Sequence, residues 1–168
     1  MVMAESDTIF DQSVKHKGFF NYTDLYNFCF NWFKDNGYKL FEKAYTEKLS
    51  SFGKEVVIEW NAKKKISDYF RLEIKAKWHI LGMNDAEIMI EDRKEKTNKG
   101  EVKIAIKGEL VRDYEENWDK TPFYKFLRGI YDKYIIRTTM DDYEDKVMDD
   151  ATDFYNEIKA FLNLEGKS

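Results

Sequence analysis

The stretch YFRLEIKAKWHIL, residues 69–81, decides the fold. Apolar side chains occupy every second position from Phe70 to Ile80, and polar side chains occupy the positions between them. This strict alternation predicts a β-strand with one buried face and one exposed face. At about 3.3 Å per residue the strand is about 35–40 Å long, a length that favours a twisted, curved sheet. We therefore expect the rest of the chain to pair beside this strand or to cover its apolar face.

Four further stretches are predicted to be strands of an antiparallel meander around it, namely residues 38–49, 55–63, 86–93 and 101–112. GMND at residues 82–85 predicts a turn out of the central strand. TNKG at residues 97–100 predicts a hairpin, because Asn and Gly tolerate positive φ. Residues 8–17 fit a short additional strand, so the sheet has five or six strands. Residues 1–7 are polar, and we expect them to be disordered.

Three amphipathic helices complete the predicted fold. Asn21 or Thr23 can cap a first helix that ends near Asn36, ahead of Gly37. A second helix begins at the Thr-Pro pair of residues 121–122. A third runs from about residue 139 to about residue 162.

The 168 residues are expected to form a single α+β domain. We predict a curved, mostly antiparallel meander sheet of five to six strands, with the three helices packed mainly on one face. This order of elements (a helix, a meander and a long terminal helix) is similar to that of helix-grip domains of the START and Bet v 1 type. The similarity lies in the order of the elements.

Composition excludes several classes of protein. The single cysteine, Cys29, excludes an intrachain disulfide and a thiolate metal site, and it fits a reducing compartment. The first residues lack the basic and apolar regions of a signal peptide. No apolar run reaches the length of about 18 residues that a membrane span requires. We therefore expect a cytoplasmic protein.

The sequence contains no glycine-rich phosphate loop, zinc-protease motif or nucleophile elbow. We therefore predict no cofactor and no metal, and we favour a non-enzymatic protein, although carboxylate-only active sites leave little trace in a sequence. Cys29 lies on the apolar stripe of the first helix and is expected in the core. His79 falls on the polar face of the central strand, where a solvated or hydrogen-bonded role is favoured.

Two functions from different classes fit these features. The first is a non-enzymatic domain that binds a hydrophobic small molecule or lipid between sheet and helices. Aromatic residues are abundant (13 Phe, 11 Tyr and 4 Trp), and small residues interrupt the bulky rows at Ala62, Ala76 and Gly108. These gaps would either leave a ligand cavity or allow close packing of a helix. The predicted lining residues are Trp60, Ile74, Trp78, Ile106, Phe126 and Phe154.

The second is a protein–protein interaction module or a homo-oligomeric subunit. Residues 54–112 carry 14 basic and 11 acidic side chains, whereas residues 113–168 carry 8 basic and 14 acidic ones. A basic sheet face and an acidic terminal helix could therefore meet between copies of the chain or on another protein. The candidate interaction residues are Arg71, Lys75, Lys77, Asp142, Asp145 and Asp149. Nucleic acid is disfavoured, because Phe70 and Trp78 fall on the opposite face from the lysines.

Overall fold

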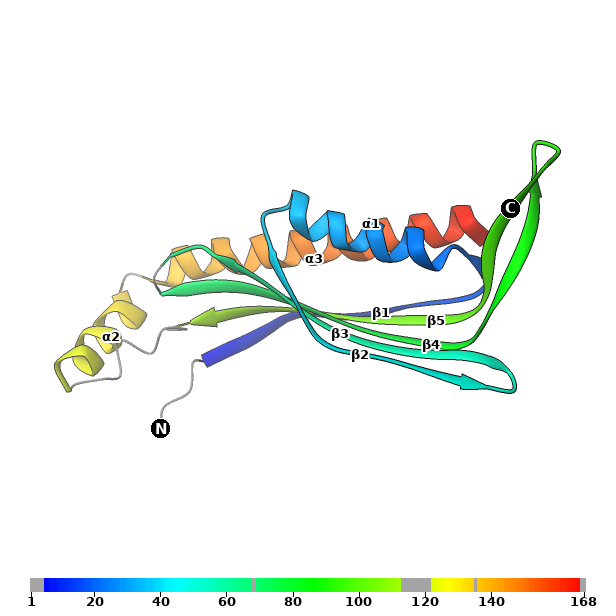
Figure 1. Cartoon of the computed structure of the whole chain (residues 1–168). Helices are drawn as coiled ribbons and strands as arrows, with labels where there is room; N and C mark the ends of the chain where they lie inside the picture. Colours follow the sequence, from blue (N-terminus) through cyan, green and yellow to red (C-terminus); the bar gives the residue numbers. More distant parts are fainter. Residues whose placement is uncertain (1–4, 68, 113–121, 135, 167–168) are drawn as a thin grey trace.

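The computed structural model describes residues 5–67, 69–112, 122–134 and 136–166. It confirms the α+β class, with a five-stranded antiparallel sheet in the order β1-β5-β4-β3-β2. The strands are β1 (Glu5–Phe20), β2 (Lys39–Ser50), β3 (Gly53–Lys65), β4 (Phe70–Ile90) and β5 (Arg93–Arg112). The helices are α1 (Tyr22–Asp35), α2 (Pro122–Tyr134) and α3 (Ile136–Gly166). Figure 1 shows the sheet with α1 and α3 lying on one side of it.

The first strand is longer than the sequence suggested. β1 pairs with β5 from Glu5 opposite Arg112 onward, so residues 5–7, which we expected to be disordered, belong to the sheet. An ion pair of 2.9 Å between Arg112 Nη2 and Glu5 Oε2 joins the two strands where this pairing starts.

Helix α1 begins and ends where the sequence predicted. The side chain of Asn21 accepts a hydrogen bond of 3.0 Å from the backbone N–H of Asp24, which caps the first turn. At the other end Gly37 adopts φ +80°, a conformation that glycine reaches at little cost. The N–H of Tyr38 then bonds the carbonyl of Phe33 at 2.9 Å, and the chain turns directly into β2.

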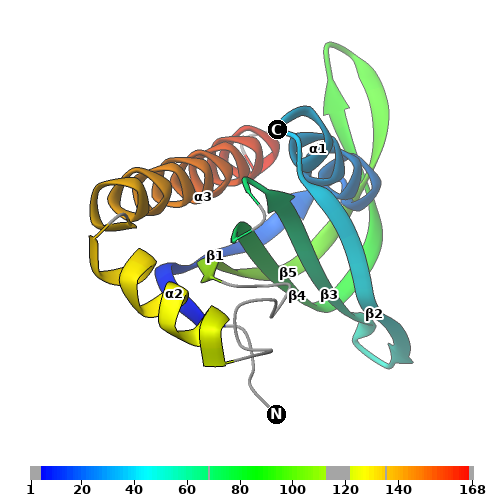
Figure 2. The same ribbon diagram turned by 90° about the vertical axis from the view of Figure 1, so that its left-hand side faces the viewer.

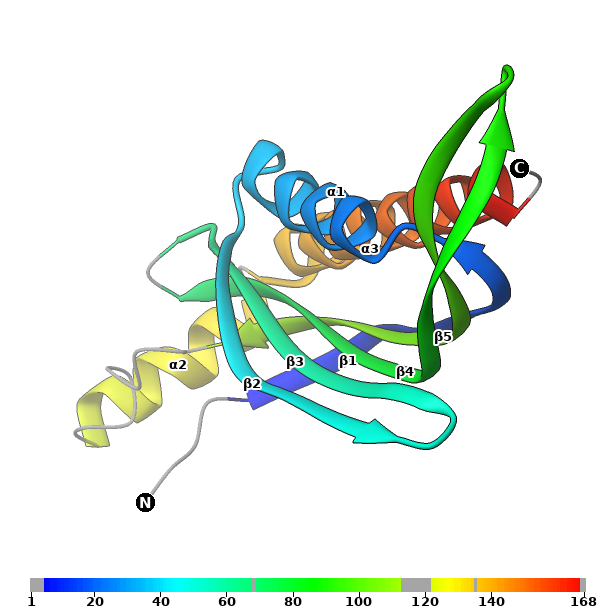
Figure 3. The same ribbon diagram turned by 45° about the vertical axis from the view of Figure 1, so that its right-hand side comes forward.

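The predicted turns at residues 82–85 and 97–100 are both wrong. β4 continues through residues 82–85 with a shift of register between Leu81 and Asn84, and the chain reverses at Glu91 and Asp92, which both have positive φ. The long β4–β5 hairpin rises from the sheet beyond that shift, as Figure 3 shows. Asn98 accepts a hydrogen bond of 2.9 Å from the N–H of Tyr22, so it supports the start of α1 instead of making a turn.

Alternation divides the sheet into two faces. The inner face is apolar and is covered by α1 and α3, and the outer face carries the charged residues. Strand residues of the inner face and helix residues such as Phe33, Val147 and Ile158 are buried in one continuous core. The aromatic rings of Phe28 and Phe161 stack at 5.0 Å between the two helices. The core therefore holds both helices against one face of the meander.

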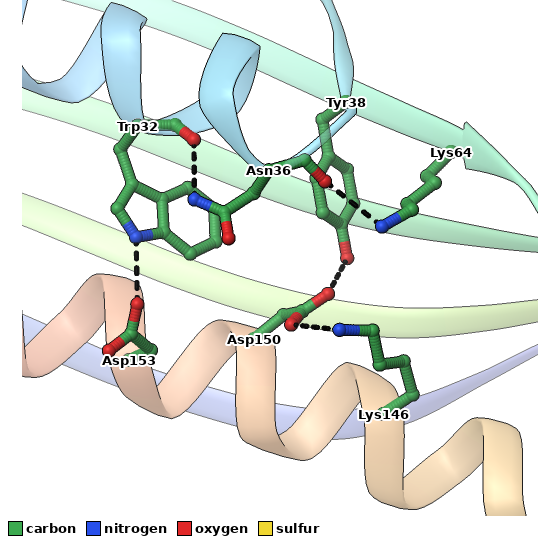
Figure 4. A network of polar contacts seen from close by, with 7 residues as sticks. All are labelled: Trp32, Asn36, Tyr38, Lys64, Lys146, Asp150 and Asp153. Carbon is green, nitrogen blue, oxygen red and sulfur yellow. Dashed lines mark hydrogen bonds and ion pairs between the residues drawn. The ribbon is translucent and has the colours of Figure 1, made fainter.

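A polar network ties α3 to α1 and to the start of β2 (Figure 4). The hydroxyl of Tyr38 donates to Asp150 at 2.8 Å, and Lys146 donates to the other oxygen of that carboxylate at 2.9 Å. The indole N–H of Trp32 donates to Asp153 at 2.9 Å. Asp150 is buried, so these partners replace the water that its charge loses.

Helix α2 lies beyond the end of the sheet, as Figure 1 shows, and Figure 2 shows that it does not lie across the apolar face as α1 and α3 do. Its residues Phe123 and Phe126 are 64% and 63% exposed. The proline of the predicted start is the first residue of α2, whereas Thr121 is outside the described residues.

Candidate functional site

The structure brings together five of the six residues predicted to line a ligand cavity. Trp60, Ile74, Trp78, Ile106 and Phe154 all belong to the core between the sheet and the two helices, and none is more than 2% exposed. Phe126 is separated from them because α2 lies away from the inner face. The predicted lining residues therefore form one cluster, except for Phe126 on α2.

One of the three predicted gaps is filled by a helix. A Cβ atom placed on Gly108 would lie 3.0 Å from Val147 Cγ1 and 3.2 Å from Ala151 Cβ, both on α3. It would also lie 3.3 Å from Phe10 Cβ on the neighbouring strand. The missing side chain at Gly108 therefore allows close approach of α3 and leaves no cavity there.

The most unusual feature of the core is a pair of tryptophans without hydrogen-bond acceptors. The rings of Trp60 and Trp78 lie 5.2 Å apart in an edge-on arrangement, and Tyr26 of α1 lies 5.0 Å and 6.3 Å from them. Both indole nitrogens are buried, and within the described part of the chain neither has a hydrogen-bond partner. Their surroundings are aromatic and aliphatic, and a π face accepts a hydrogen bond only weakly. Two donors in the core are therefore unsatisfied.

Above these tryptophans, α1 is joined to β2 by a row of exposed side-chain hydrogen bonds, which we call the α1–β2 seam. Tyr26 donates to Glu42 at 2.9 Å, and the hydroxyls of Tyr22 and Tyr45 lie 2.8 Å apart. Tyr45 also donates to Glu47 at 2.7 Å. Partial burial, together with the bond to the Glu42 carboxylate, raises the pKa of Tyr26 to about 12. The tyrosines of the seam are therefore protonated donors at neutral pH.

The basic interaction candidates lie on the outer face of β4, and each forms an ion pair. The pairs are Arg71 with Glu73 at 3.2 Å, Lys75 with Glu109 at 3.1 Å and Lys77 with Glu59 at 3.5 Å. Glu73 and Glu109 are buried and lie directly opposite each other in the sheet. Because two like charges in that position repel, Arg71 and Lys75 have a structural role in compensating them.

The acidic candidates Asp142, Asp145 and Asp149 lie on the exposed side of α3. Among the residues that the structure describes, no group of three or more His, Cys, Asp or Glu side chains is arranged to hold a metal ion. His79 lies on the outer face and its Nε2 is 2.9 Å from Glu55 Oε1, a hydrogen-bonded role of the kind that the sequence favoured. Cys29 is fully buried, which raises the pKa of its thiol well above the usual value.

Sequence reasoning missed the seam tyrosines and one aromatic residue on the outer face. Phe41 lies directly opposite Asn61, on the face that carries the lysines. Its ring is approached by Lys39 and Lys63 at 5.4 Å and by Lys43 at 5.7 Å. A bulge between Glu42 and Ala44 breaks the alternation of β2, so the sequence pattern did not show that Phe41 lies on the same face as the lysines.

The fold and site define an α+β protein in which α1 and α3 cover an aromatic-rich sheet face. Comparison with protein-family models, with curated proteins and with solved structures gave no match for the chain. None of the helices in the described ranges combines the length and apolar character needed to cross a membrane.

Proposed function

We propose that this protein is a non-enzymatic domain that binds a hydrophobic small molecule or lipid between α1 and the sheet, beside Trp60 and Trp78. The observation that carries the proposal is the pair of buried indole N–H groups without an acceptor. Leaving one such donor unsatisfied costs about 1–3 kcal/mol. A bound molecule with a carbonyl, ether or similar acceptor would remove that cost at both donors. The proposed ligand is therefore largely apolar and carries an uncharged acceptor.

The seam supports α1–β2 as the route by which such a ligand enters. The contacts between α3 and the sheet are buried, whereas the seam bonds of Tyr26, Tyr22 and Tyr45 are exposed to water. An exposed hydrogen bond contributes little net stability, because water replaces it when it breaks. Glu42 and Glu47 would disfavour an anionic head group at this entrance, which agrees with an uncharged acceptor.

The test is native mass spectrometry of the freshly purified protein at two ionic strengths. A monomer that carries a discrete extra mass, released on denaturation, is the expected result, and extraction of that mass identifies the ligand. A bare monomer at both ionic strengths contradicts the proposal.

Three tryptophan variants make the test specific. Trp60→Phe and Trp78→Phe keep an aromatic ring but remove the unsatisfied donor, so we expect both to lose the extra mass. Trp32→Phe is the matched control, because that indole lies in the same core and already donates to Asp153. Equal retention in all three variants would show that the two donors do not select the ligand.

A second candidate function is favoured by the placement of charge. The outer face of the sheet is basic at its centre, and α3, with its exposed carboxylates, lies on the other side of the molecule (Figures 1 and 2). These two surfaces cannot meet within one chain. They also cannot both be used in a closed two-fold dimer, which pairs identical patches. If they bind each other, the assembly is head-to-tail and grows with concentration.

Sedimentation velocity at low and high salt tests this candidate. A head-to-tail assembly gives a sedimentation coefficient that rises with protein concentration and falls as salt screens the charges. Neutralising Asp142, Asp145 and Asp149 with asparagine should abolish it. A discrete dimer that is indifferent to salt would contradict it.

A further inference from the structure

The outer face contains a hollow with a volume of about 430 Å³, at the centre of the sheet and on the opposite side from the proposed ligand site. Ala105 of β5 contributes only a methyl group there, and longer side chains surround it. Four of them are lysines from three different strands, Lys43, Lys75, Lys77 and Lys107. The hollow therefore exists because one short residue sits among long basic ones.

The local charge of this hollow is positive. Asp11 and Glu59 are the acidic side chains among its lining residues, against four lysines. Glu59 is engaged by Lys77, whereas Lys43 and Lys107 have no carboxylate partner among the described residues. Because Glu109 pairs with Lys75, the local excess is one positive charge, and Lys43 and Lys107 are the two lysines of the hollow whose charges are left to attract a phosphate group.

The register of the strands also places like charges together at this face. Lys75 lies directly opposite Lys107, Lys15 opposite Lys103, and Lys39 opposite Lys63. Directly opposed like charges destabilise a sheet. Lys75 and Lys63 form ion pairs with neighbouring carboxylates, whereas Lys107 forms none among the described residues, although Asp11 lies directly opposite it on β1. An anion bound in the hollow would remove the repulsion between Lys75 and Lys107.

A third observation concerns Asn61, which also lines the hollow. Its side-chain oxygen is buried and has no hydrogen-bond partner in the described part of the chain. A buried acceptor of this kind calls for a donor such as a hydroxyl or amino group. Inorganic phosphate can offer only its own P–OH group as a donor, whereas a phosphorylated molecule with hydroxyl groups supplies the anion and a separate donor.

We propose that this hollow binds a small organic phosphate, with the phosphate group on the lysines around Lys107 and a hydroxyl or amino donor bonded to the Asn61 oxygen. A long polyanion is the less suitable occupant, because the chain as a whole has a net charge of −4. The site goes beyond the proposed function, since it lies on the other face of the sheet.

Isothermal titration calorimetry at an ionic strength of about 0.15 M, where the Debye length is about 8 Å, tests the site with ribose 5-phosphate and inorganic phosphate as probes. The wild-type protein is expected to bind ribose 5-phosphate more tightly than inorganic phosphate. Lys107→Gln should weaken both by about 10-fold or more, because it removes a charge-assisted hydrogen bond. Asn61→Ala should weaken ribose 5-phosphate by about 2- to 10-fold and leave inorganic phosphate unchanged. Because that variant removes an unsatisfied acceptor, it is expected to remain folded.

Lys103→Gln is the matched control, since Lys103 lies on the same strand and the same face but outside the hollow. We expect its affinities to stay within about twofold of wild type, because a distant exposed charge is largely screened. Equal losses in Lys107→Gln and Lys103→Gln would overturn the proposal in favour of diffuse electrostatic attraction. Tighter binding of a single-stranded oligonucleotide that ignores Lys107→Gln would overturn it in the same way, as would failure of either probe to bind.

Discussion

Replacing Gly108 by alanine tests whether α3 or empty space lies above the middle of β5. The added Cβ would come within 3.0 Å of Val147 Cγ1, 3.2 Å of Ala151 Cβ and 3.3 Å of Phe10 Cβ. Each distance is shorter than the usual contact of about 3.5–4.0 Å between carbon atoms. Two of the three neighbours belong to a helix, so α3 must move away from the sheet as a unit or its core side chains must repack.

The expected size of the effect follows from two opposing contributions. Overpacking a dense core costs about 1–3 kcal/mol. Losing the flexibility of glycine in the unfolded chain recovers about 0.4–1 kcal/mol. Gly108→Ala should therefore lower the free energy of unfolding by about 1–2 kcal/mol. In a chain of this length that corresponds to a fall in Tm of about 2–8 °C.

The assay is urea unfolding followed by circular dichroism, with two companion variants. Gly129→Ala on α2 is the control, because in the described part of the chain no atom outside its own helix backbone lies within 4 Å of the added Cβ. Better helix propensity should stabilise this variant by up to about 1 kcal/mol. Combining Gly108→Ala with Val147→Ala should cost less than the sum of the single changes, by about 0.5 kcal/mol or more. A neutral or stabilising Gly108→Ala that adds independently to Val147→Ala would refute close packing and place a cavity between β5 and α3.

Three further results are expected. Trp78→Ala should lower the free energy of unfolding by about 3–5 kcal/mol in the same assay, whereas Phe126→Ala on the exposed face of α2 should change it by less than about 0.5 kcal/mol. Tyr38→Phe should cost about 1.5–3 kcal/mol because it deprives the buried Asp150 of a partner, and an unchanged midpoint would place Asp150 in contact with water. Stability should fall as the pH rises from 10 to 12, since the native-state pKa of Tyr26 is about 12 against 10.0 for an ordinary tyrosine, so the native state holds a proton that the unfolded chain has lost. A pH series that is identical for wild type and Tyr26→Phe would contradict this last assignment.

The sequence predicted those parts of the fold that depend on local periodicity. Alternation over residues 69–81 identified the central strand and its buried face, and helical spacing with an asparagine cap identified α1. Turn-forming residues were less reliable indicators of where the chain reverses. Asn98 accepts a hydrogen bond from the first turn of α1, and Gly100 allows the backbone of residues 81–83 to approach closely. The actual reversal at Glu91 and Asp92 carries no glycine, so turn composition did not indicate it.

The site could be predicted only in part, for a related reason. Periodicity shows that Phe126 lies on an apolar helix face, but it does not show what covers that face. The partners of the Trp60 and Trp78 nitrogens depend on three-dimensional neighbours, and so does the hollow around Ala105, which requires the register of several strands. A one-residue change of register would move Ala105 away from the lysines.

The two faces of the sheet leave different groups unsatisfied, and this difference separates the two proposed sites. On the inner face the unpaired groups are donors, the indoles of Trp60 and Trp78, in surroundings without charge. On the outer face they are the buried acceptor of Asn61 and the exposed ammonium group of Lys107. An apolar molecule on the outer face would displace water from the lysines without supplying a negative charge, and an organic phosphate would lose its hydration on the inner face without a cation to replace it. Each proposed ligand is therefore matched to one face and excluded from the other, so the tryptophan and lysine variants should act on separate binding events.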